Sequence, residues 1–198
     1  MIMLILGLII FLGSHSFNIY AEDWRRRQIL HFGVQGWKGR YALASLAGLI
    51  LIIFGFGEAR MTSVLLYAPP NWLRYINILL TLIAFVLLTA AYTPRNHFKA
   101  RIGHPMLAGV AIWAFGHLLA IGMLSDVVLF GAFLVWAFTD FVVSRARDRR
   151  VGTVYPVGTR EGDVTTIVVG VIIWIVFAFW AHRWLIGVDP LAGVRPSF

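Results

Sequence analysis

The residues of this sequence that could do chemistry in an apolar environment are histidines. Four of the six lie within or at the edge of apolar blocks: His15, His104, His117 and His182. The chain has no cysteine and only 9 acidic residues, whereas neutral imidazole is a good ligand for zinc, copper and haem iron. Zinc requires three or four close ligands, but haem needs only one or two axial imidazoles in an apolar, aromatic pocket. These residue types therefore favour a haem site.

The spacing of the histidines limits how they could share an iron. His104 and His117 are thirteen residues apart, about 20 Å along a helix, so one haem must take its second ligand from another helix. The pairing stays open, because His182 is closer in depth to His117 and His104 is closer to His15. Trp113 lies one turn from His117 and is expected either to stack on the cofactor or to fill space.

A structural role is the alternative for each of these histidines, since a polar group in a membrane span needs a partner and often finds it on a neighbouring helix. His104 directly precedes a proline that could begin a helix, and His182 borders a group of interfacial residues. The remaining two histidines, His31 and His97, fall in basic segments, where we expect them to be solvated.

Apolar segments of transmembrane length must position these side chains. Of the 198 residues, 60% are hydrophobic and 13% are charged, with a mean hydropathy of +0.81, which excludes an ordinary water-soluble enzyme. About twenty apolar residues cross the hydrocarbon core as a helix, and a helix satisfies its own backbone in lipid. The sequence predicts an all-α, polytopic bundle of six transmembrane helices. They cover residues 2–20, 41–57, 72–92, 105–123, 125–143 and 164–187. Pro105 and Asp163 are expected to begin or cap the fourth and sixth of these helices.

The basic residues indicate how the bundle is oriented. Of the 17 Lys and Arg residues, thirteen fall in the first, third and fifth connecting segments, around residues 25–40, 95–101 and 145–160. Basic loops face the cytoplasm in membrane proteins, so we predict both termini outside and these segments as cytoplasmic loops. The net charge of +8 is then explained by anionic lipid at the membrane surface and not by nucleic acid.

Two pairs of glycines point to close helix packing. Gly48 and Gly55 are seven residues apart in the second predicted helix, and Gly109 and Gly116 repeat this spacing in the fourth. Small residues on one face allow helices, or a flat ligand, to approach the backbone. Helix packing is the favoured interpretation.

Four sequence segments resemble the NnrU family of bacterial membrane proteins, and together they extend over essentially the whole chain. They are Leu12-Gly13-Ser14-His15-Ser16, Gly36-Trp37-Lys38-Gly39-Arg40-Tyr41, the segment from His104-Pro105-Met106-Leu107 to Trp113-Ala114-Phe115-Gly116-His117-Leu118-Leu119, and Ala181-His182-Arg183-Trp184-Leu185-Ile186-Gly187. The resemblance implies a single NnrU-like domain over residues 1–198 in the bacterial inner membrane.

The family takes its name from an association with nitrite and nitric oxide reduction, and it includes the haem b-dependent 15-cis-ζ-carotene isomerase. By motif position, the two haem-binding histidines of that isomerase correspond to His15 and His117, with His104 and His182 as further family positions. Phe17 and the His182-Arg183 pair depart from the isomerase pattern, so the resemblance is closer to the NnrU branch.

Two functions follow as expectations. The first is an integral membrane protein that binds haem b through His15 and His117. It would act as a redox-dependent cis–trans isomerase of an apolar polyene, with an electron donor that supplies electrons to the haem. The alternative is a non-enzymatic accessory protein that supports denitrification enzymes. A small transporter is disfavoured, since no internal repeat is present.

Overall fold

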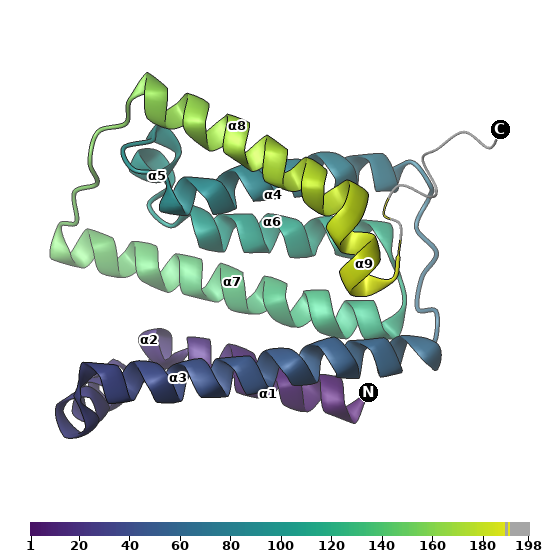
Figure 1. The fold of residues 1–198 in the computed structure, drawn as a ribbon, viewed down its shortest axis with the longest axis horizontal. Helices are drawn as coiled ribbons and strands as arrows, with labels where there is room; N and C mark the ends of the chain where they lie inside the picture. Colours follow the sequence, from purple (N-terminus) through teal and green to yellow (C-terminus); the bar gives the residue numbers. More distant parts are fainter. Residues whose placement is uncertain (189, 191–198) are drawn as a thin grey trace.

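A computed structural model of the chain describes residues 1–188 and residue 190 (Figure 1). These residues form helices and connecting loops, and their β-structure is limited to a single bridge between Leu65 and Met123. In chain order the elements are α1 (Ile2–His15), α2 (Phe17–Tyr20), α3 (Glu22–Met61), α4 (Leu73–Tyr92), α5 (His97–Ile102), α6 (Pro105–Ala120), α7 (Leu124–Val151), α8 (Arg160–Val176), the π-helical turn η1 (Phe177–Ala181) and α9 (His182–Ile186). The all-α prediction is confirmed for this part of the chain.

Four helical segments of the described chain, and not six, are long and apolar enough to cross a membrane. They are α3, α4, α7 and the continuous run from α8 through α9. The first and fourth predicted spans correspond to α1 and α6, apolar helices of only 14 and 16 residues. At 1.5 Å per residue these helices extend for about 21 and 24 Å, less than the thickness of the hydrocarbon core.

Backbone hydrogen bonds at their carboxyl ends explain why these two helices are short. At the end of α1, the Ser16 amide donates to the Gly13 carbonyl, three residues earlier instead of four, at 3.1 Å, so the α-helical hydrogen-bond pattern is interrupted there. After α6, residue Ile121 is extended, and the Gly122 carbonyl accepts from the Leu66 amide of another loop at 2.8 Å. The chain is therefore diverted before either helix reaches its predicted end.

Two connecting segments that the sequence predicted as loops are largely helical. The first part of α3 contains residues 22–32, and α7 continues to Val151. Charged side chains such as Arg and Glu are good helix formers, so the helices continue past their apolar parts. Gly33 bends α3 with φ 72° and ψ 166°, a conformation that is nearly restricted to glycine. The last predicted cap is also wrong, because Thr159 caps α8 through a hydrogen bond from the Gly162 amide.

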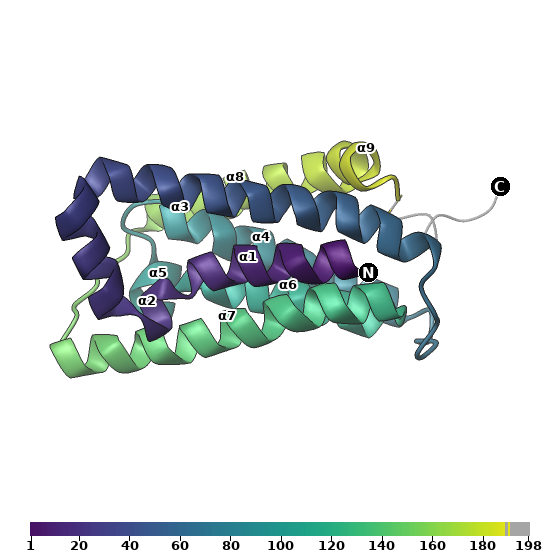
Figure 2. The same cartoon turned by 90° about the horizontal axis from the view of Figure 1, so that it is seen from below.

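The helices form a bundle in which α7 lies between two groups (Figure 1). On one side α1 packs along α3, and on the other α6 packs on both α4 and α7, with α8 against α4. Figure 2 shows α1 lying between α3 and α7. The start of α3, α5 and the end of α7 lie at one end of the bundle, which we call the basic end because these segments carry most of the Lys and Arg residues.

Glycines set the close helix contacts, as the sequence predicted. A Cβ atom at Gly48 of α3 would lie 2.7 Å from the Phe11 amide nitrogen of α1, and a Cβ at Gly55 would lie even closer to the Leu4 amide nitrogen. On α6, a Cβ at Gly109 would lie 2.9 Å from the Ala84 carbonyl of α4. The backbones therefore approach within distances that only glycine allows, which fixes α1 on α3 and α6 on α4.

Candidate functional site

His15 is the last residue of α1, and its ring lies among aromatic side chains. Its Nδ1 lies 2.7 Å from the Phe11 carbonyl oxygen. A carbonyl can only accept, so Nδ1 carries the proton, and the lone pair of Nε2 is left for another group. The ring centroid is 5.3 Å from that of Tyr41 on α3 and 6.0 Å from that of Trp136 on α7.

His117, on α6, has the same local arrangement. Its Nδ1 donates to the Trp113 carbonyl at 2.8 Å, so its Nε2 is also left with a lone pair. Its ring stacks on Phe130 of α7 with a centroid distance of 4.3 Å and an interplanar angle of 20°. An Nδ1–H bonded to a backbone carbonyl is the arrangement that orients imidazole as a metal ligand through Nε2. Within the described residues, neither His15 nor His117 has a hydrogen bond to Nε2.

A series of aromatic rings connects the two histidines. Between ring centroids, Phe11 lies 4.3 Å from His15 and 5.9 Å from Phe133. Trp113 in turn lies 5.6 Å from Phe133 and 5.2 Å from His117. No direct ring contact joins His15 to His117 in the described chain. Trp113 thus contacts His117, as its spacing suggested, and packs in the core beside Ala114 and Phe130.

The aromatic face of α7 was not anticipated from the sequence. Phe130, Phe133 and Trp136 follow one another at intervals of three residues and contact both histidine-bearing helices. The Trp136 indole N–H is buried and has no hydrogen-bond partner among the described residues, which is unusual for a buried donor. The three-residue spacing of these aromatics was visible in the sequence, but only the packing shows which helices they face.

His104 belongs to a polar network at the basic end. Its Nε2 lies 2.9 Å from the Asp148 carboxylate of α7, and the Tyr155 hydroxyl donates to the same carboxylate oxygen at 2.6 Å. Arg145 is 3.8 Å from that oxygen. Burial and the hydrogen bond to Asp148 raise the pKa of Tyr155 to about 12. The backbone of His104 precedes α6, but its side chain makes no cap hydrogen bond. Its side chain instead joins α6 to α7 and to the loop before α8.

His182 begins α9, at the end of the bundle opposite the basic end. Its Nδ1 donates to the Val188 carbonyl at 2.8 Å, and its ring lies 5.8 Å from that of Phe177. Among the described residues, no ring contact or hydrogen bond joins His104 or His182 to the rings around His15 and His117. Their predicted place at the cofactor stays a prediction.

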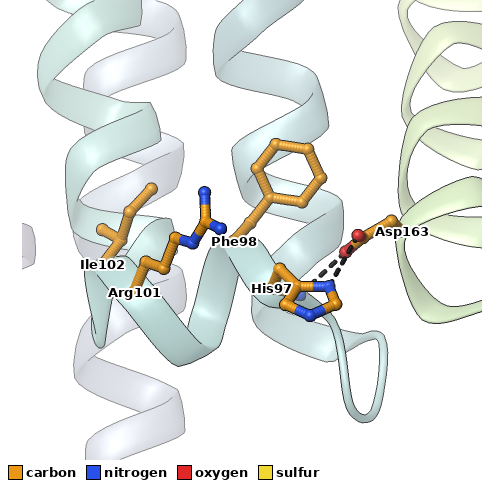
Figure 3. Close-up of a pocket in the computed structure, with 5 residues that line it drawn as sticks. All are labelled: His97, Phe98, Arg101, Ile102 and Asp163. Carbon is orange, nitrogen blue, oxygen red and sulfur yellow. Dashed lines mark hydrogen bonds and ion pairs between the residues drawn. The ribbon is translucent and has the colours of Figure 1, made fainter. Parts of the chain in front are cut away.

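His97 is not simply solvated, contrary to expectation. Its Nδ1 lies 2.8 Å from one carboxylate oxygen of Asp163 on α8, and its backbone amide donates to the other at 2.7 Å (Figure 3). The pair therefore fastens α5 to α8. It borders a cavity of about 400 Å³ whose other lining residues are Phe98, Arg101 and Ile102.

The described residues contain no group of three or more His, Asp or Glu side chains that could hold a metal ion together. A tetrahedral zinc site needs at least three protein ligands. Single imidazoles with a free Nε2, such as His15 and His117, suit an iron whose other ligands come from a porphyrin.

The fold and the apolar surface define the class of the protein. Large hydrophobic side chains such as Phe54, Val135 and Phe138 are more than half exposed on the long helices, as in helices that contact lipid. The chain is an all-helical membrane protein with imidazoles packed among aromatic rings. More particularly, residues 3–190 match the family described as NnrU protein, so the chain belongs to the NnrU family. No curated protein and no solved structure matches it.

Proposed function

We propose that this protein binds haem b within the membrane and that His15 and His117 are its iron ligands. The observation that carries the proposal is the shared arrangement of these two imidazoles. Each has its Nδ1–H bonded to the carbonyl four residues earlier on its own helix, at 2.7 and 2.8 Å. The hydrogen bond fixes the tautomer and the direction of the ring, so that Nε2 is available to a metal.

The surroundings of both histidines suit a porphyrin better than a free metal ion. Tyr41, Trp113, Phe130 and Trp136 have rings within 6.0 Å of one or the other imidazole, and a porphyrin is bound mainly by such apolar and aromatic contacts. The unsatisfied N–H of Trp136 is a further polar group available to a ligand in this region. The donor set and the apolar lining thus fit haem.

Bound haem would supply an iron whose ligation and redox state can change. Apart from the Ser14 hydroxyl near His15 Nδ1, the side chains in contact with the two imidazoles in the described structure are aromatic, and none of them is a carboxylate. The protein's own contribution would therefore be to orient the iron and exclude water, and not to transfer protons. A cis–trans isomerisation of a polyene is compatible with such a site because bond rotation needs neither an acid nor a base.

An absorption spectrum of the purified protein tests the proposal. Protein from haem-replete cells, or apoprotein titrated with hemin, should show a Soret band in the oxidised and reduced states. His15→Ala and His117→Ala should each weaken this band, because each removes one proposed iron ligand. His31→Ala is the matched control, since His31 is an exposed histidine whose ring packs on Phe32. A colourless protein that does not bind added hemin would overturn the proposal.

The more specific roles are separate predictions that the family resemblance implies. An isomerase should convert a cis-polyene only when the iron is reduced, whereas an accessory protein should leave the polyene unchanged and affect nitrite and nitric oxide reduction when its gene is deleted. The haem spectrum is compatible with both roles, so these two assays separate them.

A further inference from the structure

A second cavity of about 300 Å³ lies beside His15 and is shaped by the bend of α3. Its lining comes from α1, α2 and both parts of α3, since the chain turns back at Gly33. The lining residues are Ser14, Phe17, Arg25, Ile29, Val34, Trp37, Lys38 and Tyr41. Ser14 is the neighbour of His15 in sequence, and the Tyr41 ring is 5.3 Å from the imidazole. The cavity therefore adjoins the surroundings of His15, the proposed iron ligand.

The cavity combines an aromatic wall with two positive charges. The rings of Phe17 and Trp37, 5.8 Å apart between centroids, line the cavity, and Phe17 also packs on Trp24 at 4.8 Å. Arg25 is half-buried, whereas the neighbouring Arg26 and Arg27 are exposed. In the described structure, neither the Arg25 nor the Lys38 side chain has an ion pair or a hydrogen bond with a protein group. A cavity that presents aromatic rings together with unpaired cations favours an amphipathic anion.

The size of the cavity and its place in the bundle narrow the choice of ligand. A volume of about 300 Å³ is at the lower limit for a small-molecule pocket, so it suits one edge of a larger ligand better than a whole porphyrin. The cavity lies at the basic end, to which α2 and the bend of α3 belong. Resting on the proposed haem function, we propose that Arg25 and Lys38 bind the propionate carboxylates of a haem whose iron is held by His15.

Esterification of the propionates tests this assignment without reference to activity. Detergent-solubilised apoprotein is titrated with hemin and with hemin dimethyl ester, and binding is followed by the Soret absorbance. The affinity for hemin divided by the affinity for the dimethyl ester should fall about tenfold in the double variant Arg25→Gln/Lys38→Gln. This is the order of magnitude expected when charge-assisted hydrogen bonds are lost. The position of the Soret band should not change, because both imidazoles remain. Partition of the ester into micelles is the same for every variant and cancels in this comparison.

The control variant is Arg27→Gln/Arg150→Gln, which removes two exposed charges from the same end of the bundle. This control should keep the wild-type ratio. Binding of the ester by the Arg25→Gln/Lys38→Gln variant also shows that this variant is folded. An unchanged ratio in that variant overturns the inference and leaves the haem proposal intact. Failure of the wild-type protein to bind either porphyrin overturns both.

Discussion

Four of the six histidines of this protein fall into two groups that differ in what holds the ring. His15 and His117 donate from Nδ1 to a carbonyl on their own helix and are surrounded by aromatic rings. His97 and His104 are bonded to the carboxylates of Asp163 and Asp148 on other helices at the basic end.

The difference separates residues that join helices from residues that can bind a ligand. A histidine bonded to a carboxylate 44 or 66 residues away fastens two segments of the chain. A histidine bonded to a carbonyl four residues earlier adds nothing to tertiary contact through that bond, and it keeps a lone pair on Nε2.

Replacing each pair of histidines by alanine should give the largest difference in hemin affinity. The double variant His15→Ala/His117→Ala is expected to lose about 100-fold or more in hemin affinity, because both proposed axial ligands are absent. The double variant His97→Ala/His104→Ala should bind hemin within about twofold of wild type while melting at a lower temperature, since only helix-joining contacts are lost. Hemin titration and thermal melting in detergent measure the two effects. Equal losses of affinity in the two variants would contradict the division.

Displacement of α1 should remove one proposed ligand without changing it. In Gly48→Leu the new side chain meets the α1 backbone at Phe11, 2.7 Å from the position of Cβ. We expect a loss of about 3 kcal/mol in the free energy of unfolding, the upper part of the range for overpacking, together with weaker hemin binding through His15. Gly57→Leu is the control, because a Cβ at Gly57 has nothing within 4 Å. Equal melting temperatures for the two variants would show that α1 is not packed on α3 as described.

The bend of α3 offers a smaller change close to His15. Gly33→Ala places a side chain at φ 72°, which should cost about 2 kcal/mol and weaken hemin binding by altering the cavity walls. Gly39→Ala, where a Cβ has open space and the backbone is helical, should be neutral or slightly stabilising. Thermal melting and hemin titration of both variants test this expectation. A Gly33→Ala protein as stable as Gly39→Ala would mean that the bend is not required.

The polar network around His104 should make the stability of the fold depend on pH. The hydrogen bond from Tyr155 is the largest cause that lowers the pKa of Asp148, with His104 adding to it. A lowered carboxyl pKa stabilises the fold above about pH 4 and is lost as the pH falls through the folded value. The raised pKa of Tyr155 stabilises the fold below about pH 10, and this effect is lost as the pH rises through about 12.

Tyr155→Phe removes this hydrogen bond. The melting temperature should therefore be a few degrees below that of wild type between about pH 4 and 10, with a smaller difference outside this range. Tyr20→Phe, at a tyrosine that is 74% exposed, is the control and should match wild type throughout. A difference between Tyr155→Phe and wild type that does not vary with pH would contradict the role of the carboxylate.

Much of the fold could be read from the sequence because helix formation in lipid is governed by local composition. Each predicted span contains a helix or helices, and the glycine pairs at residues 48 and 55 and at residues 109 and 116 mark real helix contacts. The lengths of α1 and α6 could not be read in this way. They are set by backbone hydrogen bonds at Ser16 and at Gly122, and the bond at Gly122 comes from a loop more than fifty residues earlier in the chain.

The sequence by itself determined the family, the all-helical class and the histidines worth considering, because these depend on residue types and short motifs. Tertiary structure alone decided which imidazoles have carboxylate partners, which aromatic face of α7 meets His15 and His117, and that Arg25 and Lys38 share one cavity. Hydrophobic periodicity carries no information on these points. The partners are brought together by the packing of α7 between two helix groups and by the bend at Gly33, and both depend on contacts between distant parts of the chain.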